Sequence, residues 1–306
     1  IRFLDQFKLY EDQSGMMSYA ERVIRKAVNI LERSYCNRLN LSAFEGGKKL
    51  RDDSIVVSMG ITTIFQAIDK MSLNRYCSYE EVGIYSSAVT LVHVFAIVQT
   101  TFAAIWSPMV VEHYEKEPED RTFYQKGFRT MSFVMFFIGI SLILCKDLFV
   151  LLLGEDYRGS AAMIPFLCLS PIMLTISETT VIGITFSKKS YLQIIVSAIA
   201  CATNIIGNTL LVPIMGGVGA AISTGLSYIV FFSMRTFLSN RYFPMKWGVG
   251  KFFIIVLLFL VYAWYNTFHS FGAVTVLGYV VIVVIIVCNY RDVIRDGFHL
   301  LKKQFS

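Results

Sequence analysis

A series of long apolar segments begins at Ser54 and continues almost to the end of this 306-residue chain. A helix needs about 20 apolar residues to cross roughly 30 Å of hydrocarbon, and eight segments come close to that length. They are residues 54–74, 82–111, 128–153, 160–186, 190–212, 217–239, 251–268 and 272–289. The pattern predicts an all-α fold, a polytopic transmembrane helical bundle with about eight spans.

The composition agrees with this fold class. Hydrophobic residues make up 55% of the chain and charged residues 16%, whereas an ordinary soluble domain carries about 25% charge. These values argue against a soluble enzyme, a disulfide scaffold and a disordered chain. No basic stripe with interleaved aromatic residues is present, so we expect no nucleic-acid partner.

Lysine and arginine are distributed unevenly between the connecting segments. One side of the predicted bundle holds 14 of them and the other side 4. The richer side comprises residues 112–129, 187–190, 235–251 and the C-terminal tail. Because cations accumulate in cytoplasmic loops, we expect a multi-pass protein of the plasma membrane with a cytoplasmic C-terminus.

The chain divides into four predicted regions. Residues 1–53 form a cytoplasmic or interfacial segment with a short amphipathic helix, residues 54–239 a six-helix bundle, residues 251–289 two additional spans, and residues 290–306 a basic cytoplasmic tail. The chain begins with Ile1 instead of Met and carries no signal peptide. We therefore expect a fragment of a longer protein.

Ionisable residues inside spans are costly and are functional candidates by default. Asp69 and Lys70 lie near the outer end of the first predicted span. They could form a local ion pair or reach the interface, and alternatively one of the charges could face a polar cavity.

Glu178 lies deep in the fourth predicted span. Pro171 and Thr175 share its helical face, and a proline leaves one backbone carbonyl without its helical donor. Glu178 could therefore line a cavity or bind a cation or proton, or it could be a neutral carboxyl that is hydrogen-bonded between helices. Asn204 and Asn208 in the fifth span either join helices through hydrogen bonds or line a polar cavity.

Small residues and prolines predict how the helices pack. Gly219, Ser223 and Ser227 in one span, and Gly83 with Ser87 in another, have the spacing that allows close helix approach. We expect kinks at Pro108 and Pro165.

Motifs for catalysis or metal binding are missing from the sequence. The six cysteines form no CxxC, and the four histidines form no HExxH. We expect that the histidines pair with no nearby acidic cluster. GxSxG, P-loop and GxGxxG motifs are also absent. We expect no enzyme activity, no catalytic residue, no metal and no cofactor.

Three stretches of the sequence resemble bacterial polysaccharide flippases. They are IDKMSLNRYCSYEEVGIYSSAVTLV (68–92), LLLGEDYRGSAAMIPFLCLSPI (151–172) and NIIGNTLLVPIMGGVGAAISTGLSYIVFF (204–232). The resemblance is to the C-terminal part of these proteins, which belong to the multidrug/oligosaccharidyl-lipid/polysaccharide exporter superfamily. It implies that the eight spans are family helices seven to fourteen and that an N-terminal bundle is absent.

The resemblance also implies a function. Such a protein moves undecaprenyl-diphosphate-linked oligosaccharide across the inner membrane for the synthesis of O-antigen, lipopolysaccharide, capsule or exopolysaccharide. The implied partners are the lipid-linked oligosaccharide, membrane lipids, a polysaccharide polymerase and glycosyltransferases. Asp69 and Lys70 match the family motif, and Arg75 and Arg158 could meet the diphosphate at the outer mouth.

Three other functions stay open. A cation-coupled exporter of small molecules or drugs would use Glu178 as its coupling carboxylate. A membrane enzyme could act on a polyprenyl lipid, and a non-transporting remnant could pack as a bundle and move nothing.

Overall fold

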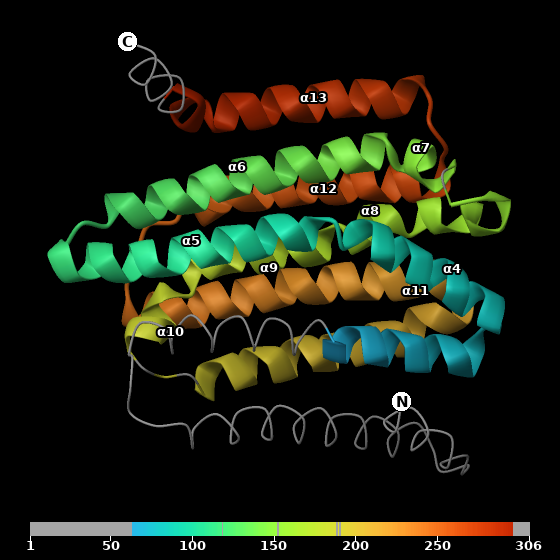
Figure 1. The fold of residues 1–306 in the computed structure, drawn as a ribbon, viewed down its shortest axis with the longest axis horizontal. Coiled ribbons are helices and arrows are strands. Elements are labelled where there is room, and N and C mark those ends of the chain that lie inside the picture. The colour runs from blue at the N-terminus through green and yellow to red at the C-terminus, as the bar shows by residue number, and fades with distance from the viewer. Residues whose placement is uncertain (1–62, 118, 152, 188, 190, 296–306) are drawn as a thin grey trace. The chain divides into compact units, whose positions relative to one another are not determined.

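The computed structural model describes residues 63–295 except 118, 152, 188 and 190 (Figure 1). All of them lie in one compact unit, which comprises residues 43–306. The predicted segment 1–53 and its amphipathic helix lie outside the described residues, as does the tail beyond residue 295.

The described residues form helices and contain no strand. Residues 63–76 are helical. The following elements are α4 (Tyr79–Val92), α5 (Phe95–Lys116), α6 (Thr122–Leu144), α7 (Lys146–Leu151), the 3₁₀ helix η1 (Glu155–Ala162), α8 (Ile164–Leu167), α9 (Leu169–Thr180), α10 (Ile182–Phe186), α11 (Tyr191–Tyr242), α12 (Val249–Phe268) and α13 (Ala273–Asn289).

Two of the predicted spans are broken helices. The segment predicted at 82–111 consists of α4 and α5, which meet at an angle of 42° around His93. The segment predicted at 160–186 contains η1 and the helices after it, with a bend of 53°. Pro165 stands in the first turn of α8, where its missing N–H costs no helical hydrogen bond. Pro108, by contrast, lies inside α5 and does not interrupt it.

The element α11 is a hairpin of two arms. Gly216 has a φ of 54° and a ψ of −133°, a conformation that favours glycine. The hydroxyl of Ser223 donates to the carbonyl oxygen of Asn204 over 2.9 Å, although residues 19 apart in a straight helix would be separated by about 28 Å. The arms therefore run antiparallel, and they correspond to the predicted spans 190–212 and 217–239.

The turn of this hairpin is tied to α4. The backbone N–H of Gly217 donates to the carboxylate of Glu81 over 2.7 Å. A Cβ atom on Gly216 would collide with the same carboxylate. The first turn of α4 therefore fixes the position of the α11 turn.

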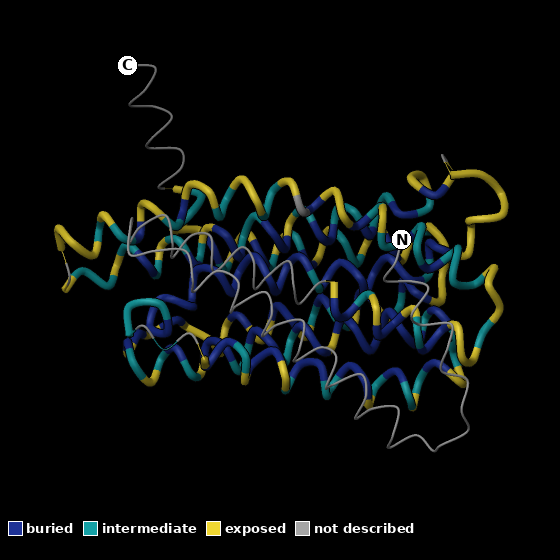
Figure 2. The backbone as a smooth tube through the Cα atoms, turned by 60° about the horizontal axis from the view of Figure 1, so that its bottom comes forward, coloured by how far each residue is buried: buried dark blue, intermediate teal, exposed yellow. Residues whose placement is uncertain are grey.

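Helix α9 lies at the centre of the bundle. Every residue of α9 except Ser170 is buried, and α9 packs against α5, α6 and α11. Buried turns gather on the inner sides of the helices and exposed turns on the outer sides (Figure 2). The C-terminal helix α13 packs on α6 and α12 at one edge of the bundle (Figure 1).

By length and composition, three described helices can cross a membrane, or five if each bent pair counts as one span. The hairpin α11 is one of the three, although it turns back at Gly216. The fold is thus an all-α polytopic membrane bundle. The connecting segment predicted at 112–129 is shorter than expected, because α5 continues to Lys116 and α6 begins at Thr122.

Candidate functional site

A cavity of about 340 Å³ opens between residues 63–76, α4, α5, α8, α9 and the second arm of α11. Its lining is mixed, with aliphatic and aromatic walls interrupted by polar groups. The polar and aromatic lining residues are Thr63, Phe65, Gln66, Asp69, Tyr85, His93, Gln99, Thr100, Ser170, Glu178, Thr224 and Tyr228. Polar groups in the wall of a cavity inside an apolar bundle are a feature that a pathway for a polar solute requires.

Asp69 lies at the centre of a buried hydrogen-bond network. Its Oδ2 accepts from the hydroxyls of Tyr85 over 2.6 Å and Thr224 over 2.7 Å. Its Oδ1 accepts from the amides of Asn208 over 2.7 Å and Asn204 over 3.2 Å. Residues 63–76, α4 and both arms of α11 thus meet at one carboxyl group.

One acceptor of this network has no partner among the described residues. Asn208 is completely buried, and its Oδ1 makes no hydrogen bond. Asn204 Oδ1 accepts only a longer bond, 3.3 Å, from the amide of Asn208. Both amides turn their nitrogens to Asp69, so the carboxyl group accepts four hydrogen bonds from neutral donors. A buried carboxyl group with no cationic partner in this network is a candidate for binding a proton.

Glu178 has a cationic partner that the sequence analysis placed elsewhere. Arg235 was counted among the cations of the connector 235–251, but it lies in the second arm of α11 and is completely buried. Its Nη1 donates to Glu178 Oε1 over 2.8 Å, and its other contacts are Ser177 Oγ at 2.6 Å and Gln193 Oε1 at 3.0 Å. Glu178 is therefore one member of an ion pair, which neither sequence hypothesis foresaw.

The local sequence of α9 compensates for its proline. Pro171 has no N–H to donate to the carbonyl of Leu167, and the hydroxyl of Ser170 donates to that carbonyl over 2.8 Å instead. The helix consequently continues through Pro171 and carries Glu178 to the cavity wall.

Five predicted site residues lie outside the cavity lining, namely Lys70, Arg75, Arg158, Asn204 and Asn208. Lys70 and Arg75 are exposed. Arg158 is exposed in η1 and forms an ion pair with Glu155 over 2.8 Å. Asp69, Asn204 and Asn208, in contrast, are brought together. Tyr85 and Thr224 were missed as members of this group, although both lie in the stretches quoted above.

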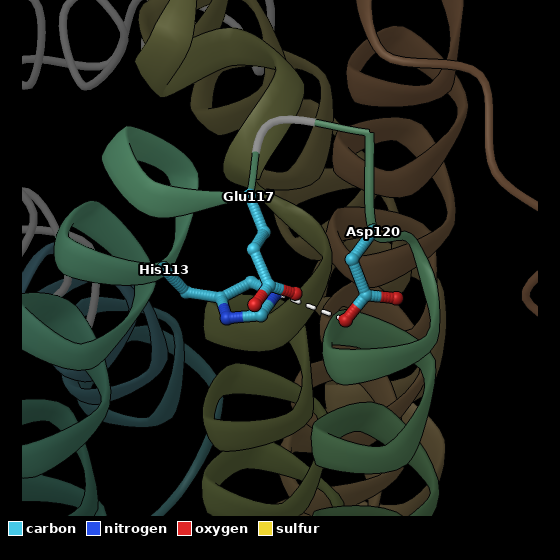
Figure 3. A group of neighbouring side chains, drawn as sticks. All are labelled: His113, Glu117 and Asp120. Carbon is cyan, nitrogen blue, oxygen red and sulfur yellow. Dashed lines mark hydrogen bonds and ion pairs between the residues drawn. The ribbon is translucent and has the colours of Figure 1, made fainter.

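A second group of polar side chains joins the end of α5 to the start of α6. The ligand-type atoms of His113, Glu117 and Asp120 lie within 4.8 Å of one another, and both carboxylates approach the imidazole (Figure 3). His113 Nε2 is 3.1 Å from Asp120 Oδ2. The expectation that no histidine pairs with a nearby acidic cluster is therefore wrong for His113, because the turn after α5 brings Asp120 back to it.

The backbone also holds Asp120 in this turn. The N–H of Thr122 donates to Asp120 Oδ1 over 2.8 Å. This hydrogen bond, with a smaller contribution from His113, holds the pKa of Asp120 below its ordinary value. The ring of His113 stacks on Phe123 at a centroid distance of 4.2 Å, so the group stabilises the connector.

Comparison with known proteins gives two matches. Residues 54–162 match a family model described as "Polysaccharide biosynthesis protein", a range that includes Asp69 and the helices from α4 to η1. No curated protein matches the chain.

The fold is similar to that of a solved structure, "Lipid II flippase MurJ, inward closed conformation". The TM-score is 0.55 and the sequence identity 16%, and the similarity covers 78% of this chain and 53% of that one. The chain thus spans about half the length of that structure and shares its fold. Both findings agree with the resemblance to polysaccharide flippases.

Proposed function

We propose that this chain lines part of the transport pathway of a polysaccharide flippase. The substrate is an undecaprenyl-diphosphate-linked oligosaccharide repeat unit, and it moves across the bacterial inner membrane without covalent chemistry. The observation that carries the proposal is a cavity with polar groups in its wall, within a bundle of MurJ-like fold. Sugars and a diphosphate do not cross hydrocarbon unaided, so such a cavity lowers the barrier.

The proposed orientation places the C-terminus and the His113 group in the cytoplasm. It rests on the excess of Lys and Arg in the connectors on that side. O-antigen, lipopolysaccharide and exopolysaccharide assembly are the candidate pathways. A polymerase and glycosyltransferases are the proposed partners, because they consume and supply this substrate.

A flipping assay tests the proposal. The natural protein is reconstituted into proteoliposomes with a fluorescent undecaprenyl-diphosphate oligosaccharide, and a membrane-impermeant reagent reports how much reaches the opposite leaflet. We expect transfer with the unchanged protein and a strong reduction with Asp69→Leu. Gln125→Ala on α6, outside the cavity lining, is the matched control. Equal transfer by protein-free liposomes would overturn the proposal.

A second candidate function, cation-coupled export, is favoured by the surroundings of Asp69. Arg235 already compensates Glu178, so Glu178 is a poor coupling carboxylate. The side chains that hydrogen-bond to Asp69 are neutral, and Asn208 Oδ1 remains available as an acceptor. We therefore propose Asp69 as the coupling group. Transport by the Asp69→Asn variant that kept its full dependence on a sodium or proton gradient would contradict this assignment.

A further inference from the structure

We infer that the cavity binds the saccharide portion of the substrate, that it favours uncharged or amino sugars, and that the diphosphate is held outside it. This inference rests on the proposed function and specifies which part of the substrate the cavity takes. It follows from the charge, the hydrogen-bonding groups and the size of the cavity.

The charge of the cavity wall is the first argument. Two carboxyl groups, Asp69 and Glu178, line the cavity, and no lysine or arginine does among the described residues. Arg235 stands behind Glu178, is completely buried and is bound to three side-chain oxygens. The wall is therefore neutral or negative.

A diphosphate has no favourable place in such a wall. Moving an anion from water into a low-dielectric site costs several kcal/mol unless a cation or several donors compensate it. The candidate cations Lys70, Arg75 and Arg158 are exposed and lie outside the lining. The cavity itself therefore offers the anionic part of the substrate no counter-charge from lysine or arginine among the described residues.

The hydrogen-bonding groups of the wall suit sugars. Each sugar hydroxyl is both a donor and an acceptor, and so is each side-chain amide. Gln66 and Gln99 supply amides to the lining, and Gln66 Nε2 lies 2.8 Å from His93 Nε2 at the bend between α4 and α5. A sugar that displaces this contact meets paired donors and acceptors.

Aromatic rings complete the wall. Tyr228 lines the cavity, and the ring of Phe65 packs edge-on against it at a centroid distance of 4.7 Å. Both rings are almost completely buried and hold the wall in place. The C–H face of a pyranose is apolar, and aliphatic lining residues such as Val89 and Ala103 provide an apolar surface for it.

The size of the cavity limits what enters it. About 340 Å³ is near the lower end of the usual range for small-molecule pockets, roughly 300–1,000 Å³. This space accommodates a few sugar rings and leaves no room for the lipid. The structure therefore separates the substrate into a sugar portion inside the cavity and charged and lipid portions outside.

Binding measurements on the natural protein in lipid nanodiscs test the inference. The probes are N,N′-diacetylchitobiose (neutral), chitobiose (cationic), a digalacturonate (anionic) and inorganic pyrophosphate. We expect the neutral and cationic disaccharides to bind about tenfold more tightly than digalacturonate or pyrophosphate, because an anion meets no counter-charge in the wall. Gln66→Ala and Gln99→Ala should each weaken binding of the neutral disaccharide about three- to tenfold, and Gln125→Ala should not.

A charge-introducing variant provides the complementary test. Gln99→Lys places a cation in the wall and should strengthen pyrophosphate binding about tenfold relative to the neutral probe. The inference fails if the unchanged protein binds anionic and neutral probes equally, or if Gln66→Ala and Gln99→Ala bind the neutral probe as the unchanged protein does. If one of these binding results is found and the protein still flips the lipid-linked oligosaccharide, the sugar-binding inference fails and the proposed function stands. If the protein binds the neutral disaccharide as expected but does not flip the substrate, only the proposed function fails.

Discussion

Arg235 Nη1 lies 2.8 Å from Glu178 Oε1, and the ion pair joins the second arm of α11 to α9 beside the cavity. The guanidinium is completely buried, whereas the Glu178 residue is 9% exposed. The two charges compensate each other in a site from which water is largely excluded.

Removing one member of this pair should destabilise the protein more than removing both. Glu178→Gln leaves a buried guanidinium without its counter-charge, which typically costs about 3–5 kcal/mol. The double variant Glu178→Gln/Arg235→Gln should regain most of that loss. Thermal unfolding in detergent, analysed as a double-mutant cycle, measures the coupling. Additive effects of the two substitutions would show that the charges do not depend on each other.

Asp69→Asn should separate packing from ion coupling. Asparagine nearly preserves the shape of the side chain but replaces one acceptor oxygen by an amide donor, which must face either the amides of Asn204 and Asn208 or the hydroxyls of Tyr85 and Thr224. We expect a loss of about 1–3 kcal/mol of stability from the mismatched hydrogen bonds and a loss of gradient-dependent transport. Gln125→Ala, which alters a polar residue of α6 outside the cavity lining, is the comparison in the same proteoliposome assay. Unchanged transport by Asp69→Asn would remove Asp69 from the mechanism.

Gly219 and Gly83 were both predicted to allow close helix approach, but replacing each of them by alanine should change the stability of the protein differently. A Cβ on Gly219 would collide with the backbone carbonyl of Leu211, so Gly219→Ala should cost about 1–3 kcal/mol. Gly83 has no atom within 4 Å of its Cβ position, which corrects the expectation of a close helix contact there. Gly83→Ala should be neutral or stabilise the helix by up to about 1 kcal/mol. Chemical denaturation of the two variants gives the comparison, and equal losses would contradict it.

Arg129 should anchor the end of α13. Its guanidinium donates to both carboxylate oxygens of Asp292 and to the carbonyl oxygen of Asn289 over 2.8 Å. Arg129→Lys keeps the charge but loses the bidentate geometry. Because the pair is partly exposed, we expect a loss of about 0.5–1 kcal/mol and faster amide exchange at the end of α13. Exchange equal to that of the unchanged protein would show that α13 is held by its apolar contacts alone.

The stability of the connector between α5 and α6 should decrease at acidic pH. The hydrogen bond from Thr122 lowers the pKa of Asp120 in the folded protein. A lowered pKa means that the stabilisation is fully present above the ordinary value of about 3.9 and is lost as the pH falls through the folded value. The change in unfolding midpoint over this acidic range should be smaller for Asp120→Asn than for the unchanged protein. Identical pH profiles would contradict the assignment.

The apolar runs located the helices well because a membrane imposes length and composition on each span. Asp69, Asn204 and Asn208 stood out for the same reason, since polar groups are rare in such runs. Their convergence on one another could not be read from the sequence, because Asn208 lies 139 residues from Asp69. The burial of Arg235 was not predicted, because this residue occurs near the end of an apolar run, where a cation usually belongs to a loop. Its partner Glu178 is 57 residues away, on a different helix.

The hairpin of α11 implies an order of assembly in the membrane. Contacts between its arms join residues only 19 or 20 positions apart, so the two arms can pair as soon as both have been inserted. Asp69 is synthesised long before Asn204, Asn208 and Thr224, and the nearest of these partners in sequence is 135 residues away. Until the hairpin arrives, the carboxyl group lacks three of its four hydrogen bonds. We therefore expect the helix that carries Asp69 to stay near the membrane interface or the translocation machinery until late in synthesis, because burying an unpaired carboxyl group is costly. The hairpin then provides the polar partners that let this helix settle into the bundle.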